Sequence, residues 1–232
     1  YINMSNMSNI LKPPTIPSSD DVSTLHEQSM YKNSNKKVIY NNWSNSYDTY
    51  VDSLNYDAPH NLVKMCLPFI TNDTNHTILD FGCGTGLVGM ELKNNFLLNT
   101  TLTGIDISEG MIIECLKKNV YDKLFNIDIT DTSYNDIDTL IQNIGGVKFD
   151  IIICCGVFLE GHLNMNIIPD ILCKLLNKPG YVCFSIRDSY YKENIDFFKE
   201  IEKDSNINIL IKQQISYLEN VEAWGFILEV DI

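Results

Sequence analysis

The sequence lacks any long apolar run. No stretch approaches the ~18 apolar residues that a membrane-spanning helix needs, so we expect no membrane segment. The N-terminal stretch lacks the basic, apolar and small-residue order of a secretory signal, and we expect none. Basic residues are few, because 17 Lys and Arg stand against 30 Asp and Glu, for a net charge of −13. Since nucleic-acid backbones are bound through clustered Lys and Arg, we expect no nucleic-acid partner; a small molecule, or a basic protein or peptide, remains open.

Cysteines at metal-binding spacing are also missing. The chain has seven Cys, an odd number, and contains neither C-x-x-C nor H-E-x-x-H, so we expect no structural metal site. Cys154, Cys155 and Cys183 lie within apolar runs. We therefore expect reduced thiols in the core of a cytoplasmic protein.

One stretch does carry a clear signal, T-I-L-D-F-G-C-G-T-G-L-V-G at Thr77–Gly89. Its first five residues form a short apolar run that predicts a buried strand. Gly82, Gly84 and Gly86 then alternate, and a helix-like apolar pattern follows. Strand, glycine turn and helix together predict a nucleotide site, because glycine lets a ligand touch the main chain and the helix presents free N–H groups.

Two classes of nucleotide fit this stretch. Gly84–Gly89 satisfies G-x-G-x-x-G, the dinucleotide pattern, which leaves an NAD-dependent oxidoreductase open. The larger pattern begins with Asp80, and a carboxylate there repels a pyrophosphate but suits a ligand with an ammonium group. S-adenosylmethionine has an amino-acid tail, a sulfonium and no phosphate. The pattern D-x-G-x-G-x-G resembles motif I of class I S-adenosylmethionine-dependent methyltransferases, which assigns Asp80 and the three glycines to cofactor binding.

Two further acids follow predicted strands. Asp106 ends the run T-L-T-G-I-D, where a carboxylate can accept both ribose hydroxyls of an adenosine ligand. Ser108 is a predicted helix N-cap. Beside it, Ile107 and Met111 are assigned to the cofactor; Met111 either covers an adenine or only packs. By the resemblance, Asp128 meets the adenine amino group and the N–H of Ile129 meets a ring nitrogen; otherwise Asp128 is a solvated loop acid.

Aromatic residues gather ahead of the first strand. Tyr40, Trp43 and Tyr47 recur at helical spacing and give one aromatic face. Either the rings pack on the core, or they form a lid over a cationic sulfonium. Y-x-x-W-x-x-x-Y-D in this position resembles small methyltransferases. The resemblance assigns Tyr40 and Trp43 to cofactor binding and Tyr47 to catalysis.

A second candidate segment follows the apolar strand predicted over 149–154. Residues 155–162 are expected to form a loop where open α/β sheets bind ligands, with Cys155 touching the cofactor. Glu160 and His162 are its only acid and imidazole, and we predict both to be catalytic. His162 could take a proton from an acceptor, or only cap or pack. Arg187 ends a later strand and is expected to extend toward the same cleft.

The expected fold is a single α/β domain over residues 38–232, after a flexible N-terminal tail over 1–37. The resemblance implies a Rossmann-like, doubly wound sheet of seven strands, mostly parallel with an antiparallel C-terminal strand, plus an N-terminal helical lid. The strands are expected over 77–81, 102–105, 124–127, 149–154, 181–186, 207–218 and 224–230.

Three local motifs narrow the resemblance. Y-N-N-W-S-N-S-Y-D at 40–48, Y-D-K-L at 121–124 and G-V-F-L-E-G-H-L at 156–163 are similar to the methyltransferase-like proteins named for the Williams–Beuren region. Many relatives that methylate adenine or glutamine carry N/D-P-P-Y/F where this chain has Cys155–Phe158, which argues against those acceptors. We expect transfer of the sulfonium methyl group to an O, N or S atom of a small molecule. A binding protein that senses S-adenosylmethionine, or serves as a partner subunit without transferase activity, is the alternative.

Overall fold

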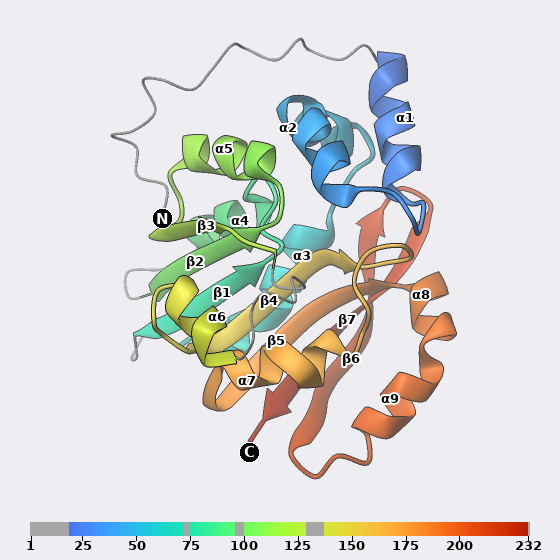
Figure 1. Ribbon diagram of the computed structural model, residues 1–232. Helices are drawn as coiled ribbons and strands as arrows, with labels where there is room; N and C mark the ends of the chain where they lie inside the picture. Colours follow the sequence, from blue (N-terminus) through green and yellow to red (C-terminus); the bar gives the residue numbers. More distant parts are fainter. Residues whose placement is uncertain (1–18, 72–74, 96–99, 129–136, 232) are drawn as a thin grey trace.

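Figure 1 shows the computed structural model, which describes residues 19–71, 75–95, 100–128 and 137–231. Its centre is one seven-stranded sheet in the order β3-β2-β1-β4-β5-β7-β6. The strands are β1 (His76–Phe81), β2 (Thr100–Asp106), β3 (Lys123–Asn126), β4 (Phe149–Phe158), β5 (Leu176–Arg187), β6 (Ile207–Leu218) and β7 (Val221–Val230). Strands β1 to β5 are parallel to one another, and β7 is antiparallel to both β5 and β6. This confirms the expected fold class.

Both faces of the sheet are buried. Ile78 and Leu79 are adjacent in β1 and have no exposed surface, yet they belong to two different core clusters. Successive strand residues point to opposite faces, so an uninterrupted apolar run predicts helices on both sides. One cluster is completed by α3 (Ala58–Cys66) and α4 (Leu87–Asn95), and the other by α6 (Ile137–Asn143), α7 (Cys173–Leu175) and α9 (Ile195–Ile201).

Three helices lie around the carboxyl ends of the strands (Figure 1). They are α1 (Ser19–Ser29), α2 (Lys36–Ser53) and α5 (Glu109–Lys118). The side chain of Asn35 caps α2 by accepting from Val38 N at 3.2 Å. Ser108 caps α5 by accepting from Met111 N at 3.2 Å, as predicted. The short helices Leu67–Phe69, Ile168–Leu172 and α8 (Asp188–Glu193) complete the described elements.

The structure differs from the sequence-based expectation in the N-terminal region. Helix α1 lies inside the range 1–37 that was expected to be a tail, so that range is not a tail throughout; residues 1–18 are outside the described part. Helix α1 packs against α2, with the His26 and Trp43 rings 5.7 Å apart. Of its side chains from residue 22 to residue 29, whose burial the structure describes, only Val22 and Ser29 are buried.

Strand β4 is longer than expected. It continues through the predicted loop as far as Phe158, because a register shift between Cys154 and Phe158 keeps this segment beside β5. Gly156 has a φ of +71°, which suits such an irregularity. Strand β5 begins at Leu176, which pairs with Phe149, five residues before the start expected at 181. Within the described ranges, no helix is long and apolar enough to cross a membrane.

Candidate functional site

The glycine turn after β1 has a left-handed backbone. Gly82, Gly84 and Gly86 have φ angles of +72°, +52° and +93°, which L-residues with a side chain rarely adopt. A Cβ on Gly82 would lie 2.7 Å from Cγ2 of Val157, whereas a Cβ on Gly84 would meet no atom within 4 Å. The turn therefore leaves open space next to the Gly84 main chain.

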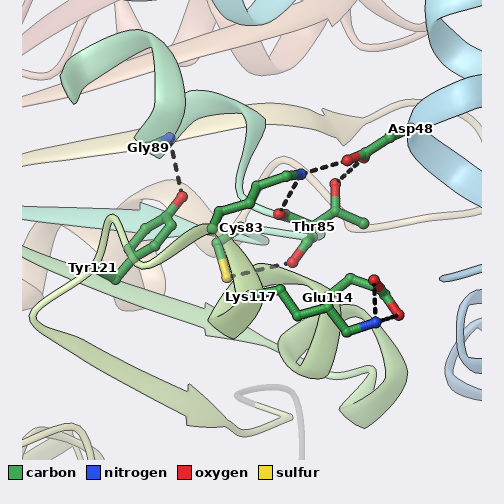
Figure 2. A network of polar contacts seen from close by, with 9 residues as sticks. Asp48, Cys83, Thr85, Gly89, Glu114, Lys117 and Tyr121 are labelled. Atoms are coloured by element: carbon green, nitrogen blue, oxygen red, sulfur yellow. Dashed lines mark hydrogen bonds and ion pairs between the residues drawn. The ribbon is translucent and has the colours of Figure 1, made fainter. Parts of the chain in front are cut away.

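The acid that leads the motif lies beneath this turn. Asp80 is fully buried, and its Oδ2 accepts a 2.5 Å hydrogen bond from the Tyr121 hydroxyl, while Oδ1 has no partner. The same hydroxyl accepts from Gly89 N at 3.0 Å (Figure 2). Burial raises the pKa of Asp80 to about 7, against the lowering effect of the Tyr121 bond and with a smaller rise from Asp106. Asp80 does not line the cavity described below, and its expected ligand contact remains a prediction.

Asp106 lies at the carboxyl end of β2 and fixes the turn from the other side. Its Oδ2 accepts from Gly84 N at 2.9 Å and its Oδ1 from Ser108 N at 2.8 Å. Burial raises the pKa of this carboxyl to about 6, and the two backbone bonds oppose that rise. Each carboxylate oxygen has two lone pairs, so both can still accept from a ligand hydroxyl.

A cavity of about 290 Å³ opens above these groups, at the carboxyl ends of β1 to β4. Parallel strands present their carboxyl ends at the same edge, which is where open α/β sheets bind ligands. Ten of the residues expected from the sequence line it: Tyr40, Tyr47, Gly82, Gly84, Asp106, Ile107, Met111, Asp128, Cys155 and His162. Phe81, Ile105 and Ile127 at the strand ends also line it, together with Lys36, Gly156, Val157 and Leu163.

The aromatic face of α2 covers this cavity with two of its three rings. Tyr40 and Tyr47 line the cavity, but Trp43 does not. Trp43 is buried behind them, stacked 5.8 Å from the Tyr40 ring and edge-on at 5.0 Å to the Tyr47 ring. Trp43 therefore packs behind the two rings that line the cavity, and its expected cofactor contact remains a prediction.

Polar side chains fasten α2 to the opposite wall. Asn41 Oδ1 accepts from Ser108 Oγ at 2.7 Å and from Gly110 N at 2.9 Å. Seven residues after Asn41, Asp48 accepts a hydrogen bond from Thr85 Oγ1 and forms an ion pair with Lys118, both at 2.5 Å. Figure 2 shows this second group next to the glycine turn. The cover is thus tied to both the turn and α5.

His162 lies on the cavity wall and forms a hydrogen bond with the hydroxyl of Tyr40 on helix α2. Its Nδ1 is 3.2 Å from the carbonyl oxygen of Glu160, which can only accept, so Nδ1 carries the proton. Nε2 therefore accepts from the Tyr40 hydroxyl at 2.8 Å. Burial lowers the pKa of His162 to about 4, assisted by the charges of Lys36 and Arg187, although the Glu160 carbonyl raises it. His162 is neutral at pH 7, and its acceptor nitrogen is already in use.

The structure does not bring the other predicted residues to the cavity. The Glu160 carboxylate pairs with Lys32 at 3.2 Å and does not line the cavity, because it lies past the end of β4 on an open turn. Gly86 packs behind the turn, where a Cβ would lie 2.8 Å from Cys115 Sγ. Ile129 lies outside the described residues. Cys155 lines the cavity as a thiol, since burial raises its pKa to about 12.

Sequence reasoning missed Lys36, the cationic residue of the cavity lining. Its Nζ donates to Ser29 O, Tyr31 O and Ser34 Oγ, each at 2.7 Å. Burial lowers its pKa. Its place four residues before Tyr40, the first residue of the aromatic helix face, is the signal that could have identified it. Among the described residues, no group of three or more His, Cys, Asp or Glu is placed to hold a metal ion.

Comparison with known proteins gives consistent matches. A family model described as "Methyltransferase domain" matches residues 72–225. Methyltransferase-like protein 27 of Homo sapiens is 29% identical over 192 residues, which cover 82% of this chain and 70% of that protein. Malonyl-[acyl-carrier protein] O-methyltransferase 2 of Ilyobacter polytropus is 28% identical over 171 residues, or 73% of this chain and 61% of the relative.

A solved structure shares the fold. It is the plantazolicin methyltransferase BpumL in complex with a pentazolic desmethylPZN analogue and SAH, with a TM-score of 0.55 and 15% sequence identity. The superposition covers 92% of this chain and 99% of that one. At this identity the likeness concerns the fold alone.

Proposed function

The chain belongs to the methyltransferase-domain family and is an S-adenosylmethionine-dependent methyltransferase, and from this premise we propose that its methyl acceptor is a small molecule. The membership confirms the cofactor expected from motif I and decides against a nicotinamide cofactor. The printed names of the relatives differ in acceptor, since one is a malonyl-[acyl-carrier protein] and another plantazolicin. The acceptor therefore has to be argued from this chain's own site.

The observation that carries the proposal is the cover over the cavity. Tyr40 and Tyr47 lie on its wall, and α2 is tied down by Asn41 and Asp48. A cavity of about 290 Å³ under such a cover suits the cofactor and a small group beside it, rather than a nucleic-acid strand. The net charge of −13 also opposes a polyanion.

The residues on the wall suit S-adenosylmethionine in distinct ways. We assign the free lone pairs of Asp106 to the ribose hydroxyls, and Asp128 with Met111 and Ile107 to the adenine. The open main chain at Gly84 suits the amino-acid tail. Asp128 has an interaction within the protein already, so its contact with the adenine would be an additional one.

The cofactor supplies a methyl group that its sulfonium already activates, and an O, N or S atom of the acceptor displaces it. The protein mainly has to align the acceptor and exclude water. Tyr47 and Tyr40 close the site, and neutral His162 positions Tyr40 by accepting a hydrogen bond from its hydroxyl. Glu160 has no part in this assignment, because its carboxylate lies outside the cavity lining. We also propose a cytoplasmic location, since all seven cysteines are free thiols.

Transfer of a radioactive methyl group tests the acceptor class. The protein is incubated with methyl-labelled S-adenosylmethionine and separate small-molecule, protein and RNA fractions of a cell extract. We expect label in the small-molecule fraction, and none with the Gly84→Val variant. Label in RNA or protein would contradict the proposal. No transfer to any fraction, with cofactor binding retained, would favour the sensor or partner-subunit alternative.

A further inference from the structure

A second, smaller recess lies beside the cofactor cavity. It measures about 40 Å³ and shares Tyr40, Tyr47 and Gly156 with the larger cavity. Its far wall comes from the end of β5, where Arg187 lies, and from Tyr217 near the end of β6. The recess thus continues the carboxyl edge of the sheet away from β2 and β3, whose acids are assigned to the adenosine.

Arg187 is the single charged side chain in the described lining of this recess, apart from the titratable His26. Among the residues that the structure describes, it forms no ion pair. Among the described residues its Nε is buried without a hydrogen-bond partner, its NH1 lies 3.7 Å from the Met30 sulfur, and the neutral Tyr217 hydroxyl is a side-chain hydrogen-bond partner of the guanidinium. The guanidinium carbon lies 5.4 Å from the centre of the Tyr217 ring. A ring and a thioether are weak partners for a partly buried cation.

The other titratable groups of the recess are neutral. Burial raises the pKa of Tyr56 and of Tyr217, and Arg187 lowers the latter in part. Burial, followed by the charge of Arg187, lowers the pKa of His26, while Glu27 raises it. No carboxylate belongs to the described lining. The recess therefore holds one positive charge surrounded by neutral hydroxyl groups. The described lining offers this cation no counter-ion, so an anionic ligand would be stabilised there.

We propose that Arg187 binds a carboxylate of the methyl acceptor, so that the substrates are small molecules with a free carboxylate group. This inference rests on the proposed function, because it places the acceptor next to the cofactor cavity. The guanidinium fork matches a carboxylate in two parallel hydrogen bonds, and nearby phenol hydroxyls supply further donors.

Size and charge both favour a carboxylate over a phosphate. About 10–15 Å³ holds one water molecule, so a recess of 40 Å³ has room for about three atoms of that size. A carboxylate has three non-hydrogen atoms and a single charge, which one arginine neutralises. A phosphate dianion would remain half neutralised in a protein of net charge −13.

The alternative is that Arg187 binds the carboxylate of the cofactor itself. Arg187 does not line the cofactor cavity, whereas Lys36 does. Lys36 and Arg187 therefore line two different cavities, and we assign Arg187 to the acceptor. This gives an experiment in which the cofactor and the acceptor subsite are measured separately.

The test uses calorimetry on the full chain. S-adenosylhomocysteine is titrated first, into the wild type and into Arg187→Gln and Arg187→Lys. Benzoate, hexanoate and their amides, benzamide and hexanamide, are then titrated into the protein saturated with S-adenosylhomocysteine. Lys192→Gln is the matched control, because it removes an exposed cation near the end of β5 that pairs with Asp188 outside the recess.

We expect at least one carboxylate to bind the wild type about tenfold or more tightly than its amide, which corresponds to about 1.4 kcal/mol. Arg187→Gln should abolish that preference, Arg187→Lys should keep part of it, and Lys192→Gln all of it. S-adenosylhomocysteine affinity should stay within about twofold in every variant, which also shows that each is folded.

Carboxylates that bind no better than their amides, or a preference that survives Arg187→Gln, would overturn the proposal. So would a loss of S-adenosylhomocysteine affinity in Arg187→Gln. Failure of the wild type to bind S-adenosylhomocysteine would instead contradict the cofactor site.

Discussion

At the scale of single residues, Asp106 is the group whose protonation should govern cofactor binding. Its pKa is raised to about 6 by burial, so its carboxyl is ionised at pH 7 and protonated in more acidic solution. Each Asp106 oxygen already accepts one backbone N–H, so protonation of one oxygen removes the lone pair that it would offer to a ribose hydroxyl. The affinity for S-adenosylhomocysteine should therefore be constant above this pKa and fall by up to about tenfold for each pH unit below it.

Calorimetry over a series of pH values checks this prediction. Asp106→Asn is the matched variant, since it keeps the shape and removes the titration. It should bind more weakly near pH 7 and show a flatter dependence on pH. Equal wild-type affinity at about pH 5 and about pH 8 would count against the assignment of Asp106.

An added methyl group should lower the free energy of unfolding by different amounts at Gly82 and Gly84. Both Gly82→Ala and Gly84→Ala place a side chain at a left-handed φ, at a cost of roughly 1–2 kcal/mol. Only the Cβ at position 82 also meets Val157, at 2.7 Å. Gly82→Ala should thus lower the free energy of unfolding more than Gly84→Ala.

Denaturant unfolding measures this difference. In a Val157→Ala background the contact is relieved, so the gap between the two alanine variants should shrink. If Gly82→Ala and Gly84→Ala unfold with the same free energy in the wild-type background, the described packing of the turn is wrong.

Residue positions were predictable where a local motif fixed the backbone. Gly82, Gly84 and Asp106 line the cavity, as the motif indicates. Asp80, Trp43 and Glu160 were expected at the ligand but lie below, behind or outside the cavity. Which way a strand or helix residue faces depends on the register and twist of the fold, and one residue along β1 changes the face.

At the scale of elements, the cover formed by α2 depends on its attachment to α5 and the glycine turn. Lys118 Nζ pairs with Asp48 and also donates to Thr85 O at 2.7 Å. Its neighbour Lys117 pairs instead with Glu114 on the surface, as Figure 2 shows. The two adjacent lysines therefore form a natural control pair.

We predict that Lys118→Gln loosens the cover and Lys117→Gln does not. A hydrogen bond to a charged group contributes about 1.5–3 kcal/mol, less where it is exposed to solvent. Hydrogen–deuterium exchange of residues 36–53 should accelerate in Lys118→Gln, with weaker S-adenosylhomocysteine binding. Equal exchange rates in the two variants would show that this attachment does not hold α2.

Elements with a strong local pattern were predicted well. The bounds of β6 are as expected, because its sequence is rich in β-branched residues and keeps the period of a strand over much of its length. Helix α1 was missed because it is stabilised by contact with α2 rather than by its own amphipathic pattern. The extension of β4 past Cys154 was missed because Gly156 reads as a turn in isolation, and only pairing with β5 shows an irregular strand.

At the scale of the whole molecule, the topology separates two ligand positions along one edge of the sheet. The ends of β1 to β4 frame the cavity assigned to the cofactor, and the ends of β4 to β6 frame the recess with Arg187. The overall fold was predictable because the order of apolar strands along the chain resembles that of class I methyltransferases. The recess was not, because Arg187, Tyr56 and Tyr217 come from distant parts of the chain.

The central claim is that the cavity above the glycine turn binds S-adenosylmethionine. Calorimetric titration of S-adenosylhomocysteine into the wild type and Gly84→Val tests it most directly. A valine would fill the open space next to the turn, so the account predicts saturable binding of one ligand to the wild type and its loss in the folded variant. Absence of binding to the wild type, or unchanged affinity in Gly84→Val, would contradict the account.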